Sequence, residues 1–151
     1  MGNPNTCLLQ RRQGSGTSSN SPFSERPFMA SILVVDDENL VRGIVEEILT
    51  SQGHEVIQAT SGNEAIKMCG ERTFDLVISD LSMPLMNGFD LISALRRLQK
   101  NLPVLAISGV YTGDLLKAVK LLGAKAILEK PFGPDNLKGA VDKILAKRME
   151  T

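Results

Sequence analysis

The sequence from Val77 to Pro84 reads VISDLSMP, and it joins a run of β-forming residues to an aspartate and a turn signal. Leu76 extends the run on its N-terminal side, so apolar residues stand next to one another rather than alternating with polar ones. Such continuous apolar strands are typical of a parallel sheet that is covered by helices on both faces. The stretch therefore predicts a buried parallel strand, and it raises the question of why that strand ends on the carboxylate of Asp80.

Four similar apolar runs flank this strand, and between and after the runs lie stretches in which apolar residues recur every three or four positions. The five expected strands are Ile32–Val35, Glu55–Ile57, Leu76–Ile78, Val104–Ile107 and Ala126–Leu128. The five expected helices cover Leu40–Leu49, Ala65–Cys69, Leu91–Leu98, Leu115–Leu122 and Leu137–Leu145. Parallel neighbours need right-handed crossover connections, which such helices supply. The alternation predicts an α/β fold, a doubly wound parallel sheet made of five βα units.

The N-terminal part of the chain differs from the rest in composition. Residues 1–28 are rich in Gly, Ser, Asn and Pro without periodicity, which predicts a disordered leader. The sequence MASILVVDDE from Met29 also reads as a plausible protein start, so the leader alternatively reflects a start codon assigned too far upstream. We expect the folded domain to span residues 29–149. Only three residues follow the last expected helix, which ends near Arg148, so we expect no output domain.

The charge balance and the cysteines limit the classes of partner. The 151 residues include 17 Lys and Arg and 17 Asp and Glu, so the formal net charge is zero. This balance does not favour nucleic acid or an anionic membrane as a direct partner. Cys7 and Cys69 follow neither a metal nor a disulfide spacing, and no apolar run approaches the about 18 residues of a membrane span. We therefore expect a cytoplasmic protein.

Charged and hydroxyl side chains follow four of the five expected strands. They are Asp36, Asp37 and Glu38 after the first strand, Asp80 after the third, Ser108 after the fourth and Lys130 after the fifth. In open parallel sheets, ligands bind beyond the carboxyl ends of the strands, where the strand order reverses. If the first and third strands are neighbours, as in the order 2-1-3-4-5, three carboxylates converge on one pocket.

Carboxylates that share a pocket repel one another unless a cation lies between them. Mg²⁺ prefers oxygen ligands, takes only a few carboxylates and leaves room for a phosphate oxygen. A carboxylate in such a site can act as a nucleophile toward phosphorus and form an acyl phosphate. The pattern therefore predicts a Mg²⁺ site with phosphoryl chemistry.

Each of these residues also has a simple structural explanation when it is taken alone. Asp36 or Asp37 would cap the helix expected near Asn39. Asp80 would form a turn, and the hydroxyl and the lysine would be ordinary strand-end and surface residues. Their joint placement at four strand ends is what favours a common site.

Four motifs, in this order and spacing, resemble the response-regulator receiver domain of two-component signalling. They are ILVVDDE, FDLVISDLSMPLMNGFDL, PVLAISG and GAKAILEKPF, and the resemblance covers nearly all of residues 29–149. It implies a flavodoxin-like fold with strand order 2-1-3-4-5 and a receiver of the stand-alone, single-domain type. It also implies that a sensor histidine kinase or a histidine phosphotransfer protein phosphorylates Asp80.

The resemblance assigns roles to the other polar residues at the strand ends. The implied Mg²⁺ ligands are Asp37, Asp80 and the backbone carbonyl of Ser82, with Asp36 assisting through water. Ser108 would bind the phosphoryl group, and Lys130 would pair with it. The peptide between Lys130 and Pro131 is expected to be cis, as it usually is in this family.

The resemblance further implies that output passes through protein contacts on the face formed by the fourth helix, fifth strand and fifth helix. The lysines on this expected face include Lys117, Lys120, Lys125, Lys138 and Lys143. Ile127 stands where the family commonly has a Tyr or Phe that moves inward on activation, so the output is expected to depend more on backbone shifts. Ser82 and Val110 occupy positions that tune the access of hydrolytic water.

Three other functions share part of this pattern. Mg²⁺-dependent phosphatases of the haloacid-dehalogenase type carry a second aspartate two residues after the nucleophile, where this chain has Ser82. A phosphorylation-independent pseudo-receiver usually lacks an acidic residue, the phosphoacceptor or the lysine, and all are present here. Flavin binding would need a phosphate-cradling loop after the first strand, where DDEN has the wrong charge. We therefore expect a phosphoacceptor signalling protein rather than an enzyme.

Overall fold

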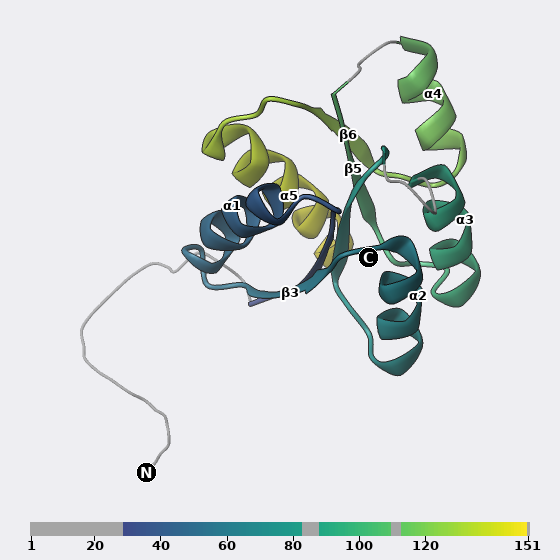
Figure 1. Cartoon of the computed structure of the whole chain (residues 1–151), viewed down its shortest axis with the longest axis horizontal. Helices are drawn as coiled ribbons and strands as arrows, with labels where there is room; N and C mark the ends of the chain where they lie inside the picture. The colour runs from purple at the N-terminus through teal and green to yellow at the C-terminus, as the bar shows by residue number, and fades with distance from the viewer. Residues whose placement is uncertain (1–28, 83–87, 110–112, 151) are drawn as a thin grey trace.

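Strands and helices alternate along residues 29–82, 88–109 and 113–150, which are the residues that the computed structural model describes (Figure 1). In chain order the elements are β2 (Ser31–Val35), α1 (Asn39–Thr50), β3 (Glu55–Ala59), α2 (Gly62–Glu71), β4 (Leu76–Asp80), α3 (Gly88–Leu98), β5 (Val104–Ser108), α4 (Gly113–Leu121), β6 (Ala126–Glu129) and α5 (Pro134–Glu150). Each expected strand and helix is therefore present. The leader predicted for residues 1–28 lies outside the described residues.

The five strands form one parallel sheet in the order β3-β2-β4-β5-β6. Counted along the chain, this is the predicted order 2-1-3-4-5, so the predicted flavodoxin-like topology is confirmed. Val34 pairs with Ile78 across β2 and β4, and Ala106 pairs with Ile127 across β5 and β6. Because all strands run in the same direction, their carboxyl ends meet at one edge of the sheet.

All five strands are longer than the sequence pattern predicted, and two of them extend through a predicted site residue. Asp80 and Ser108 were expected to follow their strands, but each is the last residue of its strand. Asp80 pairs with Ile107, and Ser108 pairs with Glu129, so the ladder continues through both polar residues. The pattern ended the strands too early because it followed side-chain polarity, whereas strand length is set by backbone pairing.

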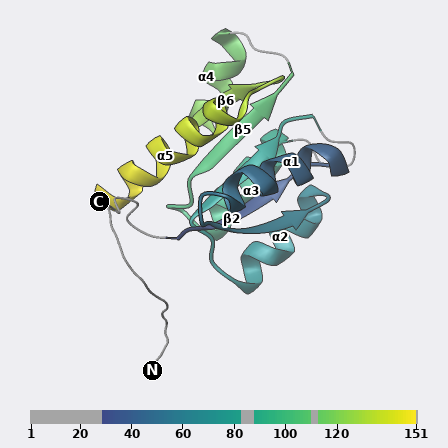
Figure 2. The same cartoon turned by 90° about the vertical axis from the view of Figure 1, so that its left-hand side faces the viewer.

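Side chains of the strands alternate between two apolar cores, one on each face of the sheet. Helices α1 and α5 cover one face and α2, α3 and α4 the other (Figure 1), and in Figure 2 α1 and α5 lie in front of the sheet. Leu33 and Val77 pack against α2, α3 and α4, whereas Ile32 and Ile78 pack against α1 and α5. All four are fully buried, and each such side chain stabilises the fold by about 1.5–3 kcal/mol. The continuous apolar strands thus reflect burial on both faces. None of the described helices is both long and apolar enough to cross a lipid bilayer.

Gly88, the first residue of α3, lies directly against the end of β4. Its backbone N–H donates to the carbonyl of Leu81 at 3.1 Å. A Cβ atom at this position would lie 2.6 Å from the Cα of Leu81 and 2.8 Å from the carbonyl oxygen of Asp80. Only glycine therefore allows α3 to begin this close to the strand that carries Asp80.

We expect Gly88→Ala to lower the free energy of unfolding by about 1–3 kcal/mol, since the new methyl group overlaps backbone atoms that cannot move aside. Gly43→Ala is the matched control, because Gly43 lies inside α1 with open space around its Cα. That control should raise the free energy of unfolding by about 0.5–1 kcal/mol. Urea unfolding of both variants tests this, and equal effects would contradict the close approach.

Candidate functional site

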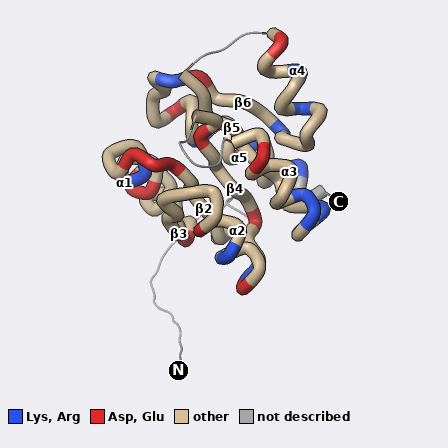
Figure 3. The backbone as a smooth tube through the Cα atoms, turned by 45° about the vertical axis from the view of Figure 1, so that its right-hand side comes forward, with Lys and Arg blue, Asp and Glu red and all other residues tan. Residues whose placement is uncertain are grey.

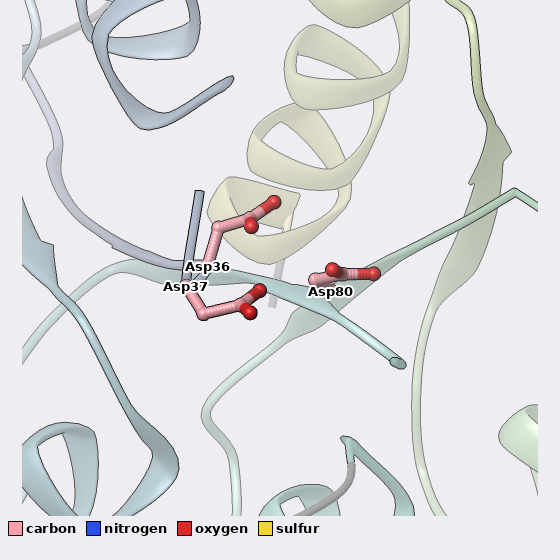
Figure 4. A group of neighbouring side chains, drawn as sticks. All are labelled: Asp36, Asp37 and Asp80. Atoms are coloured by element: carbon pink, nitrogen blue, oxygen red, sulfur yellow. The ribbon is translucent and has the colours of Figure 1, made fainter. Parts of the chain in front are cut away.

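Three aspartates meet at the carboxyl edge of the sheet. Asp36 and Asp37 follow β2, and Asp80 ends the neighbouring strand β4. One carboxylate oxygen from each lies within 4.8 Å of the others, and Figure 4 shows the three side chains side by side. Asp36 and Asp80 are buried, whereas Asp37 is exposed, so the cluster opens to solvent on one side.

Asp36 carries a carboxylate that the fold only partly satisfies. Its Oδ1 accepts a hydrogen bond of 2.9 Å from the backbone N–H of Glu38. Its Oδ2 is buried and has no hydrogen-bond partner among the described residues. Burial raises the pKa of this carboxyl group, and the negative charge of Asp80 raises it further. The ammonium of Lys130, 3.6 Å from Oδ2, offsets this cost only in part, because the pKa of Asp36 remains raised.

Asp80 is buried at the end of β4 with a contact from each of its oxygens. Oδ1 accepts from the backbone N–H of Ser82 at 3.2 Å, and Oδ2 lies 3.4 Å from the ammonium of Lys130. The first contact matches the turn-forming explanation for Asp80. The second brings a cation to the same side chain, so the turn does not account for all of its contacts.

Lys130 follows β6 and contacts three carboxylates at once. Its Nζ lies 3.6 Å from Asp36, 3.4 Å from Glu38 and 3.4 Å from Asp80. Burial alone would lower the pKa of Lys130, but the charges of Asp36 and Asp80 and the hydrogen bonds of the ammonium outweigh burial and raise it. The side chain therefore stays charged at neutral pH. The peptide between Lys130 and Pro131 is cis, as expected.

The remaining predicted site residues are also placed near this edge. Ser108 is buried at the end of β5, and its backbone carbonyl accepts from the N–H of Lys130 at 2.7 Å. Ser82 follows Asp80 and is exposed. Val110 lies outside the described residues. The sheet thus gathers Asp36, Asp37, Asp80, Lys130 and Ser108 at neighbouring strand ends.

The donor set suits a hard divalent cation. Within the described residues this cluster offers carboxylate oxygens only, and neither histidine nor cysteine belongs to it. Mg²⁺ is bound through a few carboxylates and keeps several waters, which the exposed side at Asp37 allows. An added cation would also bring further positive charge to the buried Oδ2 of Asp36, which accepts no hydrogen bond from the described residues and has the ammonium of Lys130 at 3.6 Å. The residues present therefore fit Mg²⁺.

The side chain of Arg42 hydrogen-bonds to the backbone at Asp36 and so supports the segment that carries the two aspartates after β2. The sequence pattern alone did not single out this residue. This side chain is 6% exposed, and its guanidinium donates to the carbonyl of Asp36 at 2.7 Å and to Gln58 at 2.8 Å. It also donates to Asn39 in the first turn of α1. The signal was present in the sequence, because Arg42 precedes the buried Val45 by three positions and so lies on the buried stripe of α1.

Glu38 is a second residue whose contact was not predicted. The N-cap of α1 is Glu38 rather than Asp36 or Asp37, and its side chain makes no capping hydrogen bond. The capping explanation for the two aspartates is therefore wrong. The side chain of Glu38 instead accepts a hydrogen bond from Lys130, which lies 92 positions later in the chain. Local sequence patterns do not reveal such a contact.

Comparison with known proteins gives a consistent picture. The response regulator receiver domain family matches residues 32–142. The chemotaxis protein CheY of Thermotoga maritima is 34% identical over 115 residues, which cover 75% of this chain and 95% of that protein. Sporulation initiation phosphotransferase F of Bacillus subtilis is 30% identical over 114 residues, 76% of this chain and 92% of that one. The structure of CheY4 of Vibrio cholerae superimposes with a TM-score of 0.75 at 34% identity, covering 78% of this chain and all of that one.

We expect Asp36→Asn to raise the free energy of unfolding by about 1 kcal/mol at pH 7 in the presence of a chelator, because it removes one of three crowded negative charges. The gain should shrink as the pH falls, since the raised pKa of Asp36 means that its charge, and the penalty, is lost first on acidification. Urea unfolding at several pH values measures both effects.

Asp142→Asn is the control for this prediction, because Asp142 is an exposed aspartate of α5 outside the cluster. Its free energy of unfolding should change by less than about 0.5 kcal/mol. Equal stabilisation by both variants would show that the cluster carries no particular strain.

We expect Arg42→Ala to lower the free energy of unfolding by about 2–3 kcal/mol, because it removes the guanidinium donor from the buried carbonyl of Asp36 and from the partly buried side chain of Gln58. Arg42→Lys should recover only part of this loss, since one ammonium cannot replace the guanidinium fork. Arg72→Ala is the control, because Arg72 forms an exposed ion pair with Glu55 that contributes about 1 kcal/mol or less. Urea unfolding would contradict the role of Arg42 if both alanine variants lost the same stability.

Proposed function

This chain belongs to the response regulator receiver family of two-component signalling, and from that premise we propose that Asp80 accepts a phosphoryl group in a Mg²⁺-dependent reaction. The observation that carries the proposal is the cluster of Asp36, Asp37 and Asp80, with their oxygens within 4.8 Å and Lys130 3.4 Å from Asp80. Asp80 is the member of the cluster that lies within a strand, and β4 pairs with strands on both sides, whereas Asp36 and Asp37 follow the end of β2.

Asp37, Asp80 and the backbone carbonyl of Ser82 would hold the Mg²⁺ ion, with Asp36 assisting through water. When bound, the ion offsets the negative charge of the carboxylates and of the phosphoryl oxygens. The Asp80 carboxylate would form a bond to phosphorus while the bond from phosphorus to the donor's imidazole nitrogen breaks. The electron pair of that bond stays on the nitrogen, and the histidine leaves as neutral imidazole because its other ring nitrogen carries a proton. The product is an acyl phosphate on Asp80.

Lys130 and Ser108 would stabilise that product from the neighbouring strands. The ammonium of Lys130 already lies near Asp80 and would pair with the phosphoryl oxygens. The hydroxyl of Ser108, at the end of β5, would donate to a second phosphoryl oxygen. Both residues act as electrostatic partners of the phosphoryl group rather than as acids or bases.

The phosphoryl donor is a sensor histidine kinase or a histidine phosphotransfer protein, and the output passes to a protein target through α4, β6 and α5. Relatives of this chain include a sporulation phosphotransferase and a sensor histidine kinase of Pseudomonas aeruginosa. Ile127 is half-buried on β6 and packs in the same core as Leu115 and Leu122. A change at Ser108 would reach α4 through this aliphatic packing, without an aromatic side chain on β6.

A phosphatase function is less well supported by the same site. A phosphatase with an aspartyl nucleophile needs an acid two residues later to protonate the leaving group. Ser82 occupies that position and cannot serve as this acid at neutral pH. The site therefore favours a phosphoryl group that stays on Asp80 and changes the binding of partner proteins, over rapid hydrolysis of many phosphorylated substrates.

Incubation with acetyl phosphate followed by intact mass spectrometry tests the proposal. The native chain should gain one phosphoryl group when Mg²⁺ is present and lose most of that gain in a chelator. Asp80→Asn should gain none, because the amide is not a nucleophile of comparable strength. Asp142→Asn, which changes an exposed aspartate of α5, should be modified like the native chain.

Two results would contradict the proposed function. One is an equal gain with and without Mg²⁺, which would place the modification outside the acidic cluster. The other is an unchanged gain in Asp80→Asn, which would assign the phosphoryl group to another side chain.

A further inference from the structure

Two of the three clustered aspartates lie on a short segment between β2 and α1. Residues 36–38 belong to neither element, since the strand pairing ends with Val35 opposite Ala59. The backbone N–H of Asp36 donates to the carbonyl of Ala59 at 3.3 Å, which is long for a hydrogen bond. The sheet alone therefore holds this segment less firmly than it holds Asp80, which lies within β4.

Arg42 contacts this segment at two points. Its backbone N–H donates to the carbonyl of Glu38 at 3.1 Å, and its Nη1 donates to the carbonyl of Asp36 at 2.7 Å. The second carbonyl belongs to the peptide group that joins Asp36 to Asp37. Because a peptide group is planar, a fixed carbonyl also fixes the direction in which the chain enters Asp37. Figure 4 shows the side chains of Asp36 and Asp37 leaving this segment on the side where Asp80 lies.

The guanidinium of Arg42 is itself held from two other directions. Its Nε donates to the side chain of Gln58 on β3 at 2.8 Å, and its Nη2 donates to Asn39 in the first turn of α1. The amide group of Gln58 in turn donates to Glu46 of α1. The planar guanidinium therefore joins the acidic segment, the edge strand and the helix in one fixed arrangement.

Helix formation does not explain a cation at this position. Arg42 is the fourth residue of α1, where it gains nothing from a helix dipole that favours cations near the C-terminus. Its side chain is 6% exposed, and a buried charge is costly unless it is paired. Figure 3 shows blue and red segments close together on α1, yet no ion pair among the described residues includes Arg42. Its hydrogen-bond acceptors are neutral oxygens of Asp36, Gln58 and Asn39.

We propose that Arg42 is a positioning residue for the Mg²⁺ site, an inference that rests on the function proposed above and deepens it. By holding the peptide between Asp36 and Asp37, Arg42 keeps both carboxylates directed toward Asp80 before the ion binds. Groups that orient metal ligands typically contribute about 10–100-fold to metal affinity. Arg42 therefore raises the affinity of the site for Mg²⁺, in addition to stabilising the fold.

The charge of Arg42 and its positioning role predict opposite effects. A guanidinium near the site repels a divalent cation, so if charge dominated, its removal would strengthen Mg²⁺ binding. Arg42 donates to the carbonyl of Asp36 rather than to its carboxylate. The charges that act on the carboxyl group of Asp36 are those of Asp80, Lys130 and Glu38. The positioning role therefore predicts weaker Mg²⁺ binding when Arg42 is replaced.

Mg²⁺-dependent stability tests this inference on the full chain without a phosphoryl donor. A ligand that binds only the folded state raises the free energy of unfolding by an amount set by its concentration and its Kd. Urea unfolding at a series of MgCl₂ concentrations, with NaCl keeping the ionic strength constant, therefore gives the Kd for Mg²⁺. Arg42→Ala should raise this Kd about tenfold. Arg42→Lys, which keeps the charge but loses the planar guanidinium, should raise it at least about threefold.

Two further variants separate positioning from a general loss of stability. Val45→Ala removes a buried apolar group from the next turn of α1, so it lowers stability without touching residues 36–38. Its Kd for Mg²⁺ should stay within about twofold of the native value. Asp37→Asn should lose most of the Mg²⁺ dependence, and adding Arg42→Lys to it should change the remaining affinity by less than about twofold, because Arg42 acts through the orientation of Asp37.

The outcomes distinguish this inference from the proposed function. An unchanged or lower Kd in Arg42→Ala and Arg42→Lys would overturn the positioning role alone, and so would an equal rise in Val45→Ala. If Arg42→Ala does not fold, which circular dichroism shows, Arg42→Lys decides. A native chain whose stability does not respond to Mg²⁺ would overturn both the positioning role and the Mg²⁺ site. The expected Kd shifts without phosphorylation of Asp80 would support the role of Arg42 and contradict the phosphoacceptor role.

Discussion

Electrostatic repulsion among the buried carboxylates at the carboxyl edge of the sheet is the constraint on which the rest of this structure depends. Parallel pairing places Asp36 and Asp80 at the ends of adjacent strands, so the backbone holds their charges together. The fold compensates only in part, with one lysine and a few backbone donors. The two apolar cores, one on each face of the sheet, supply the stability that offsets the repulsion between the carboxylates. A cluster of repelling charges in a fold whose other interactions are favourable is typical of a functional site.

The parallel α/β fold and the polar residues at the strand ends were predictable from patterns with a short range, whereas the order of the strands was predicted from the resemblance to the receiver family. Apolar runs identify parallel strands, and polar residues at their ends must converge once the strand order is known. Arg42 and the contact between Glu38 and Lys130 were missed for a physical reason. The apolar stripe of α1 does indicate that Arg42 is buried, but its contact with Gln58 depends on how α1 packs on β3. The contact between Glu38 and Lys130 joins residues 92 positions apart, so neither contact has a local signature. The strand ends at Asp80 and Ser108 were misplaced because side-chain polarity does not report backbone pairing.

A formal net charge of zero conceals an uneven distribution of charge along the strand direction. Acidic side chains gather at the carboxyl edge of the sheet, and basic side chains gather at the amino edge beside α5. The equal numbers of acidic and basic residues show that the chain as a whole is not a polycation. They give no information on the electrostatic potential at one part of the surface. Those fields decide which part of a partner approaches which edge. The two edges of the sheet therefore carry opposite local charge although the net charge of the chain is zero.

The position of Lys130 has a consequence for the speed of any response. Its ammonium lies between three carboxylates at 3.4–3.6 Å, longer than the about 2.8 Å of a tight charge-assisted hydrogen bond. A counterion that is shared in this way sits in a shallow energy well, because moving toward one anion costs little attraction to the others. New negative charge at Asp80 would then draw the ammonium over a short path with little reorganisation of its surroundings. If Asp80 is phosphorylated as proposed, the ammonium would therefore need only a short movement to pair with the new charge, and any slower rearrangement would fall to the helices.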